Sequence, residues 1–107
     1  MEIYQLELFL AVAEAGNLTR AARQRGLSPS AMSQQLQKLS EEFGIALFRK
    51  EGRGITLTRQ GEAFAESAKR VLREVDEMRR AVVAETDGGG GDFHFATGAS
   101  ALLHGLA

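Results

Sequence analysis

The 107-residue chain contains no cysteine, no tryptophan and a single proline. Without cysteine it can form neither a disulfide framework nor a thiolate metal site, which suits a protein of the reducing cytoplasm. No apolar run approaches the roughly eighteen residues that a membrane-spanning helix requires, and the first residues lack the basic flank and apolar core of a signal peptide. We therefore expect a cytoplasmic protein with no membrane partner.

The charge is unevenly distributed along what looks like one small soluble domain, with 44% hydrophobic and 25% charged residues. Although the net charge is −1, residues 17–60 carry eight basic and three acidic side chains, a local balance of +5. Residues 1–16 carry acids and no base, and the residues after 60 mix both signs. A segregated basic segment favours a nucleic-acid-binding surface.

Apolar residues at helical spacing predict a first helix that ends near Gly16. One face consists of Ile3, Leu6, Phe9, Leu10 and Ala13. A second side is also apolar, through Tyr4, Leu8 and Val12. A helix that is apolar on two sides is usually buried on both, so a second helix or a partner chain should cover it.

The next segments have the helix-capping residues and the glycine that are typical of a helix-turn-helix over about residues 18–37. Asn17 can cap a short helix that ends at Arg25, and Gly26 supplies the left-handed residue that often follows a helix. Ser28 can cap a third helix that begins at Pro29, where the missing N–H of proline costs nothing. The length of the turn and its glycine are typical of this motif.

The third helix is predicted to have one apolar and one polar face. Met32, Leu36, Leu39 and Phe43 form a predicted buried stripe, and Gly44 ends the helix. The opposite face carries Ser30, Ser33, Gln34, Gln37 and Lys38. Hydroxyls and amides both donate and accept hydrogen bonds, so this face suits the edges of base pairs. An ordinary solvated helix face is the alternative.

After Gly44 the helical spacing of apolar residues gives way to short strand-like segments, which predicts a two-stranded wing. Residues 46–50 and 55–58 form the strands, with Ile55 and Leu57 directed inward, and residues 51–54 form a tight turn. Arg53 lies at its tip between two glycines, where a cation can enter a minor groove or meet phosphate. A basic turn that serves only solubility is the alternative reading.

Thr58 can cap a long helix that runs to about Asp87. A heptad seam runs along it, through Phe64, Ala68, Val71, Val75, Met78 and Val82. The seam could cover the core of its own domain, but a helix of about 28 residues is roughly 40 Å long and outreaches so small a domain. We therefore predict homodimerisation through Val71, Val75, Met78 and Val82.

The C-terminal segment contains no recognisable catalytic or metal-binding motif. Residues 88–91 are four glycines and predict a flexible linker, and residues 92–107 predict the start of a strand and a helix that the chain is too short to pair. The chain is therefore expected to be cut short. His94 and His104 lack metal-ligand spacing, and no serine lies in a nucleophile motif, so we expect no enzyme activity, metal or cofactor.

Together these motifs resemble the N-terminal part of a LysR-type transcriptional regulator over residues 1–87. The matching stretches are N-L-T-R-A-A, L-S-P-S-A-M-S-Q-Q-L-Q-K-L-S-E-E-F-G, A-L-F-R-K-E-G-R-G-I-T-L-T and R-Q-G-E. The resemblance implies a mainly α fold with a winged helix-turn-helix domain of three helices and a two-stranded wing over 1–58. A dimerisation helix over 59–87, the linker 88–91 and the start of an effector-binding domain over 92–107 would follow.

The resemblance also implies a function, that of a sequence-specific bacterial transcription regulator. Such proteins bind double-stranded DNA as dimers or tetramers, and a small-molecule effector would require the missing C-terminal domain. Predicted DNA contacts are Arg20, Ser28, Pro29, Ser30, Ser33, Gln34, Gln37, Lys38 and Arg53. By resemblance, Pro29, Ser30, Ser33 and Gln34 enter the major groove and Arg53 lies near the minor groove.

Two positions depart from the family pattern. The position of Pro29 is frequently glutamine and that of Gln34 frequently arginine, so a base preference for guanine should not be transferred. Glutamine pairs best with adenine. A winged-helix module that binds a protein partner or dimerises without binding DNA is the competing hypothesis, and the +5 segment disfavours it.

Overall fold

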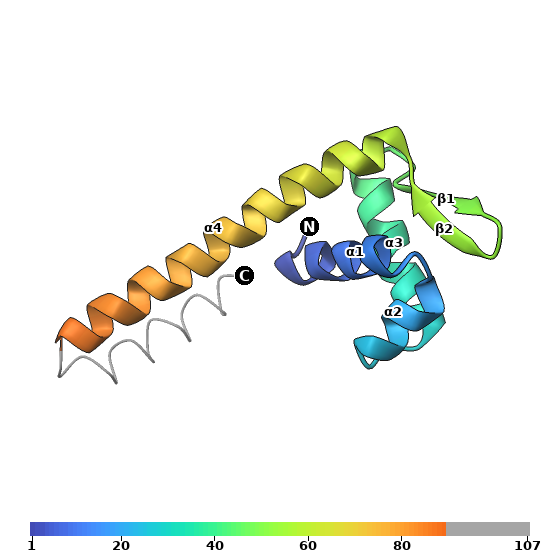
Figure 1. Ribbon diagram of the computed structural model, residues 1–107. Coiled ribbons are helices and arrows are strands. Elements are labelled where there is room, and N and C mark those ends of the chain that lie inside the picture. Colours follow the sequence, from blue (N-terminus) through green and yellow to red (C-terminus); the bar gives the residue numbers. More distant parts are fainter. Residues whose placement is uncertain (90–107) are drawn as a thin grey trace. The chain divides into compact units, whose positions relative to one another are not determined.

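The computed structural model describes residues 1–89 (Figure 1). The elements are α1 (Ile3–Ala15), α2 (Leu18–Gln24), α3 (Pro29–Phe43), β1 (Phe48–Glu51), β2 (Gly54–Leu57) and α4 (Arg59–Gly89). This order of three helices, an antiparallel hairpin and a long helix confirms the predicted fold class. The chain divides into two compact units at Arg73, and each is described by itself.

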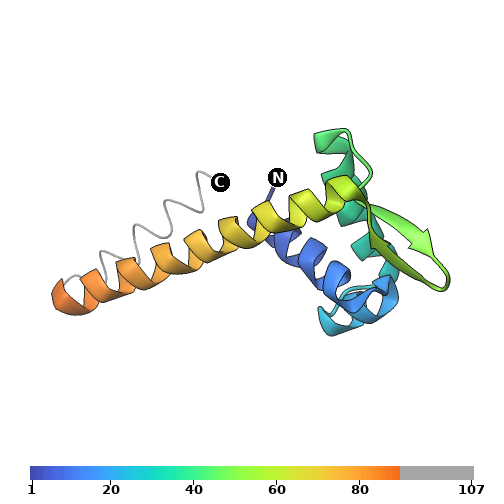
Figure 2. The same ribbon diagram turned by 45° about the horizontal axis from the view of Figure 1, so that its top comes forward.

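In the first unit, the chain itself buries residues on both apolar sides of α1, although Tyr4 on the second side is 45% exposed. Leu6 and Phe9 are buried from one side, and Leu8 and Val12 from the other. Two fully buried alanines, Ala21 and Ala22, let α2 approach the core closely. Figure 2 shows α1, α2 and α3 gathered together in the first unit. No partner chain is needed to bury Leu8 and Val12.

A row of aromatic rings joins the helices to the wing. Phe9 lies 5.2 Å from Phe48 of β1 and 5.0 Å from Phe64 of α4, measured between ring centroids. Phe64 in turn meets the ring of Phe43 edge-on at 5.0 Å. The prediction that Phe43 is buried was wrong, since it is 45% exposed. Phe43 is the last residue of α3, beyond the turns that the core covers, so the ring keeps one open side.

The hairpin is shorter than predicted. Its register pairs Phe48 with Leu57 and Glu51 with Gly54, so the turn itself is Gly52 and Arg53. β1 begins two residues later than the predicted strand. Leu47, just before β1, is buried, and its carbonyl accepts the backbone N–H of Thr58 at 3.0 Å, at the start of α4.

The first turns of α4 belong to the core of the first unit. Thr58 caps the helix as predicted, because its Oγ1 accepts the N–H of Gly61 at 2.9 Å. Ala65 and Ala68 are buried, and Phe64 packs against the core. Glycine is required at position 61, since a Cβ there would overlap the carbonyl oxygen of Leu47.

The second unit, from Glu74, is helical through Gly89. The helix therefore extends two residues past the predicted end at Asp87, into the predicted glycine linker. The rest of that linker, the predicted elements of residues 92–107, His94 and His104 lie outside the described residues. None of the helices described over 1–89 is both long and apolar enough to cross a membrane.

Candidate nucleic-acid interface

The α2–α3 corner has the geometry of a helix-turn-helix. Asn17 Oδ1 accepts the backbone N–H of Arg20 at 2.8 Å and so caps α2. Gly26 follows the helix with a φ of 71°, a backbone conformation that residues other than glycine rarely adopt. The N–H of Leu27 then returns to the carbonyl of Ala22 at 2.8 Å, which closes the turn.

The third helix, α3, begins at Pro29 as predicted, because the residues around its start cap it. Ser28 Oγ accepts the N–H of Ala31 at 3.1 Å, and Pro29 occupies the first turn. The hydroxyls of Ser28 and Ser30 are 3.4 Å apart. Because the cap uses Ser28 Oγ only as an acceptor, its proton is still available for donation to Ser30 or to a ligand.

The two predicted faces of α3 are present in the structure. Met32, Leu36 and Leu39 are buried. The residues opposite them are exposed: Ser28, Pro29, Ser30, Ser33, Gln34, Gln37 and Lys38. The exposed side chains thus form a polar surface with one cation and no acid before Glu41.

A side-chain bridge between α1 and α3 was not predicted. Gln5 Nε2 donates to Gln35 Oε1 at 3.2 Å, while Gln5 Oε1 accepts the N–H of Glu2 at 2.8 Å. Gln35 is half-buried, unlike the neighbouring Gln34. The bridge helps to fix α3 against α1, and so fixes the direction in which its exposed face points.

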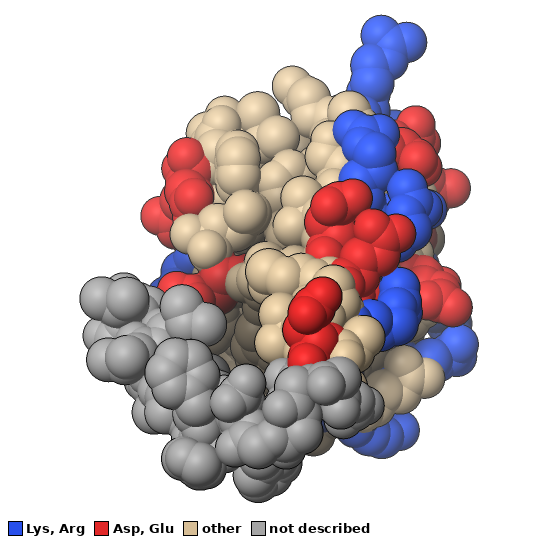
Figure 3. Space-filling view, turned by 90° about the vertical axis from the view of Figure 1, so that its left-hand side faces the viewer, with Lys and Arg blue, Asp and Glu red and all other residues tan. Residues whose placement is uncertain are grey.

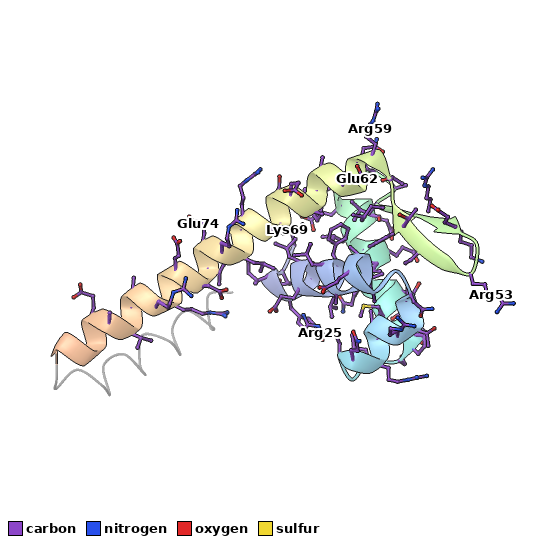
Figure 4. All side chains as sticks on the ribbon, viewed as in Figure 1. Arg25, Arg53, Arg59, Glu62, Lys69 and Glu74 are labelled. Atoms are coloured by element: carbon purple, nitrogen blue, oxygen red, sulfur yellow. The ribbon has the colours of Figure 1, made fainter. Side chains whose placement is uncertain are left out.

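The wing presents Arg53 at its tip. Figure 4 shows this side chain projecting from the hairpin turn, away from the helices. In Figure 1 the hairpin and α2 lie on the same side of the first unit. Arg49 and Glu51 form an exposed ion pair of 3.8 Å, which contributes little. Lys50, an exposed cation on the same strand face as Phe48, was not among the predicted DNA contacts.

Contacts that the sequence did not reveal fix both ends of the wing. The N–H of Ile55 donates to the carbonyl of Gly16 at 3.1 Å, outside the hairpin. At the other end, the Thr58 hydroxyl donates to the carbonyl of Ala46 at 2.6 Å. The wing is therefore held to the α1–α2 corner and to α4.

The predicted dimerisation residues lie on exposed or half-exposed parts of α4. Val71 is 38% exposed, Met78 60% and Val82 57%, whereas Val75 is half-buried. Val71 also lines an open apolar groove of about 430 Å³ in the first unit, with Met1, Phe43 and Phe64. Figure 3 shows acidic and basic side chains side by side on one face of the molecule. On α4, Lys69 and Glu66 form an ion pair of 3.6 Å.

The described residues offer no metal chemistry. Within residues 1–89 no group of three or more histidine, aspartate or glutamate side chains could hold a metal ion. No polar side-chain atom buried in that range lacks a hydrogen-bond partner.

The surface that the structure does assemble is a capped polar helix beside a basic wing, which defines a winged helix-turn-helix protein of the DNA-binding type.

The chain belongs to the LysR family of bacterial regulatory helix-turn-helix proteins, whose family model matches residues 3–62. That family consists of transcription regulators, and it confirms the expectation of a non-enzymatic protein. Among curated relatives, the transcriptional regulator ClcR of Pseudomonas putida is 37% identical over 99% of this chain, and BudR of Klebsiella aerogenes is 47% identical over 67%. The chain spans 36% of ClcR and 50% of BudR.

Solved structures show the same fold. The CbnR DBD–DNA complex matches with a TM-score of 0.76 at 38% identity, covering 80% of this chain and 99% of that one. The BenM DBD/catB site 1 DNA complex matches with a TM-score of 0.79 at 32% identity, covering 85% and 98%. Both relatives are bound to DNA in these structures.

Proposed function

We propose that residues 1–58 bind double-stranded DNA with sequence specificity as the DNA-binding part of a bacterial transcription regulator. The observation that carries the proposal is the exposed polar face of α3, which begins at the Ser28 cap and lies opposite the buried Met32, Leu36 and Leu39. The DNA complexes of similar CbnR and BenM domains support it.

In this proposal the first two turns of α3 enter the major groove. Ser30, Ser33 and Gln34 supply short hydroxyl and amide groups at the depth of base edges. Gln34 selects adenine, because its amide can donate to N7 and accept from N6 at once. Pro29 contributes only an apolar ring, which suits contact with a thymine methyl group.

The remaining predicted contacts position the domain on the phosphate backbone. Arg20 lies in the first turn of α2, Lys38 lies further along α3, and Arg53 lies at the wing tip near the minor groove. Ser28 and Gln37 flank the base-reading residues on the same exposed surface. Contacts of this kind set affinity and its salt dependence, and they carry little sequence information.

The proposed functional unit is a homodimer. The apolar residues Val71, Val75 and Met78 recur at heptad spacing on α4, and all three remain at least partly exposed. Two-fold pairing would place two recognition helices on successive half-sites. A tetramer and a small-molecule effector belong to the longer proteins of the family, and the cytoplasm is the expected compartment.

Footprinting on the DNA upstream of the gene and its divergent neighbour would first identify a bound site. A fluorescently labelled duplex of that site would then be titrated at several salt concentrations. We expect affinity to fall steeply with salt, because lysine and arginine side chains release counterions from phosphate. Affinity that does not change with salt would overturn DNA binding and favour the protein-interaction module.

A further inference from the structure

One hydrogen bond ties the wing to the corner between α1 and α2. The N–H of Ile55 points out of the hairpin and donates to the carbonyl of Gly16 at 3.1 Å. Gly16 ends α1 in the left-handed conformation, with a φ of 66°. The carbonyl that the helix end leaves free is thus used as an acceptor for a strand.

Glycine at position 54 permits this approach. A Cβ at Gly54 would lie 2.5 Å from the carbonyl oxygen of Gly16, closer than side-chain carbons are found. The obstructing atom belongs to the backbone, so it cannot rotate away as a flexible side chain would. By contrast, a Cβ at Gly52 in the turn would meet nothing within 4 Å.

The same junction adjoins two of the proposed phosphate contacts. Arg53 immediately precedes Gly54 at the wing tip. On the other side, Asn17 follows Gly16 and holds the N–H of Arg20 at the start of α2. The wing cation and the helix cation therefore each lie within a few residues of this one backbone contact.

We propose that the Gly16–Gly54 junction is a positioning element that fixes Arg53 relative to α2, so that both cations meet the DNA backbone together. Neither glycine touches DNA in this arrangement. The inference rests on the proposed DNA-binding function and adds to it a pair of positioning residues, because binding energy depends on where a cation is held.

The test is a double-mutant cycle of Gly54→Ala and Arg53→Ala on the footprinted duplex. Gly54→Ala should lose most of the affinity that Arg53→Ala loses. In the Gly54→Ala background, removing Arg53 should then cost far less than it costs in the wild type. Full additivity of the two changes would overturn the proposal, since it would mean that Arg53 is placed without the junction.

Ala63→Gly is the control, because it weakens an exposed position of α4 without touching the wing. The full effect of Arg53→Ala should persist in that background. If Gly54→Ala does not fold, Ile55→Pro replaces it in the cycle, since it removes the donor to Gly16 while the hairpin keeps its own hydrogen bonds. Ile55→Ala, which keeps the N–H, is then the control.

Hydrogen exchange supplies a measurement that needs no variant. The Ile55 amide should exchange slowly, whereas the Lys50 amide opposite it, which also points out of the hairpin, should exchange quickly. Equal exchange would overturn the junction. A wild-type chain with no salt-dependent DNA affinity would instead overturn the proposed function, and the two failures are therefore distinct.

Discussion

Thr58 donates a hydrogen bond to the carbonyl of Ala46 at 2.6 Å. The same hydroxyl accepts the N–H of Gly61 at 2.9 Å, so it caps α4 while it holds the segment that enters the wing. A hydroxyl can do both because it carries one donor and two acceptor lone pairs. The segment that leads into the wing and the start of α4 are thus fixed by a single side chain.

Replacement of this hydroxyl should destabilise the first unit without changing its surface. Thr58→Val keeps the shape but removes the cap and the donor, and we expect a loss of about 1–2 kcal/mol in the free energy of unfolding. Urea denaturation followed by circular dichroism measures it. Thr58→Ser retains the hydroxyl and should recover much of the loss; equal stability of the two variants would contradict the capping role.

Base reading is tested on the exposed face of α3. Ser33→Ala and Gln34→Ala should each weaken specific binding by about 1–3 kcal/mol while affinity for an unrelated duplex stays nearly constant. Gln24→Ala, at an exposed end of α2 outside the predicted contacts, is the control. A parallel loss on both duplexes would show that Ser33 and Gln34 touch only the backbone.

The preference for adenine gives a sharper version of the same test. Single-base substitutions across the footprinted half-site should reveal one adenine whose replacement costs affinity in the wild type and almost none in Gln34→Ala. This pattern follows because a lost amide can no longer discriminate the base it paired with. If guanine is preferred at that base pair, the proposed role of Gln34 is wrong.

Local chemistry made much of this fold predictable from the sequence. Asn17, Ser28 and Thr58 were predicted as caps, and each makes the expected side-chain bond. Capping, left-handed glycine and apolar spacing depend on neighbours a few residues away, so a single chain reveals them. The start of α3 and its exposed polar face followed from these rules alone.

The misjudged features depend on residues that are distant in the sequence. Phe43 fits the apolar period of α3, but whether its ring is covered depends on how far the core extends. Gln35 looks like its exposed neighbours until Gln5 of α1 is placed against it. Similarly, nothing near Gly54 in the sequence indicates that the carbonyl of Gly16 lies against it. Tertiary packing decides each case.

The wing cation is expected to act through phosphate. Arg53→Ala should lower affinity and reduce the slope of log affinity against log salt by about one, the amount for one neutralised phosphate. Arg59→Ala removes the same charge from the first residue of α4, outside the wing (Figure 4), and should leave the slope unchanged. An unchanged slope in Arg53→Ala, together with a lost preference for A·T flanks, would indicate minor-groove reading instead.

Dimerisation is tested by placing charge in the seam of α4. In a paired helix, Val75 and Met78 would be desolvated by the partner, and two acids there would be stranded in an apolar contact. Val75→Glu with Met78→Glu should therefore produce a folded monomer with a lower melting temperature, since the interface no longer contributes. Two acids are needed because a Glu and a Lys could pair across the seam.

Sedimentation of wild type and double variant at equal concentration decides the question. Arg73→Ala with Arg80→Ala makes the same change in net charge at positions one heptad apart and away from the seam, and it should leave a dimer. Specific DNA affinity should fall only in the seam variant, because a monomer reads one half-site. A monomeric wild type, or a seam variant that remains dimeric, would mean that Val75 and Met78 do not hold two chains together.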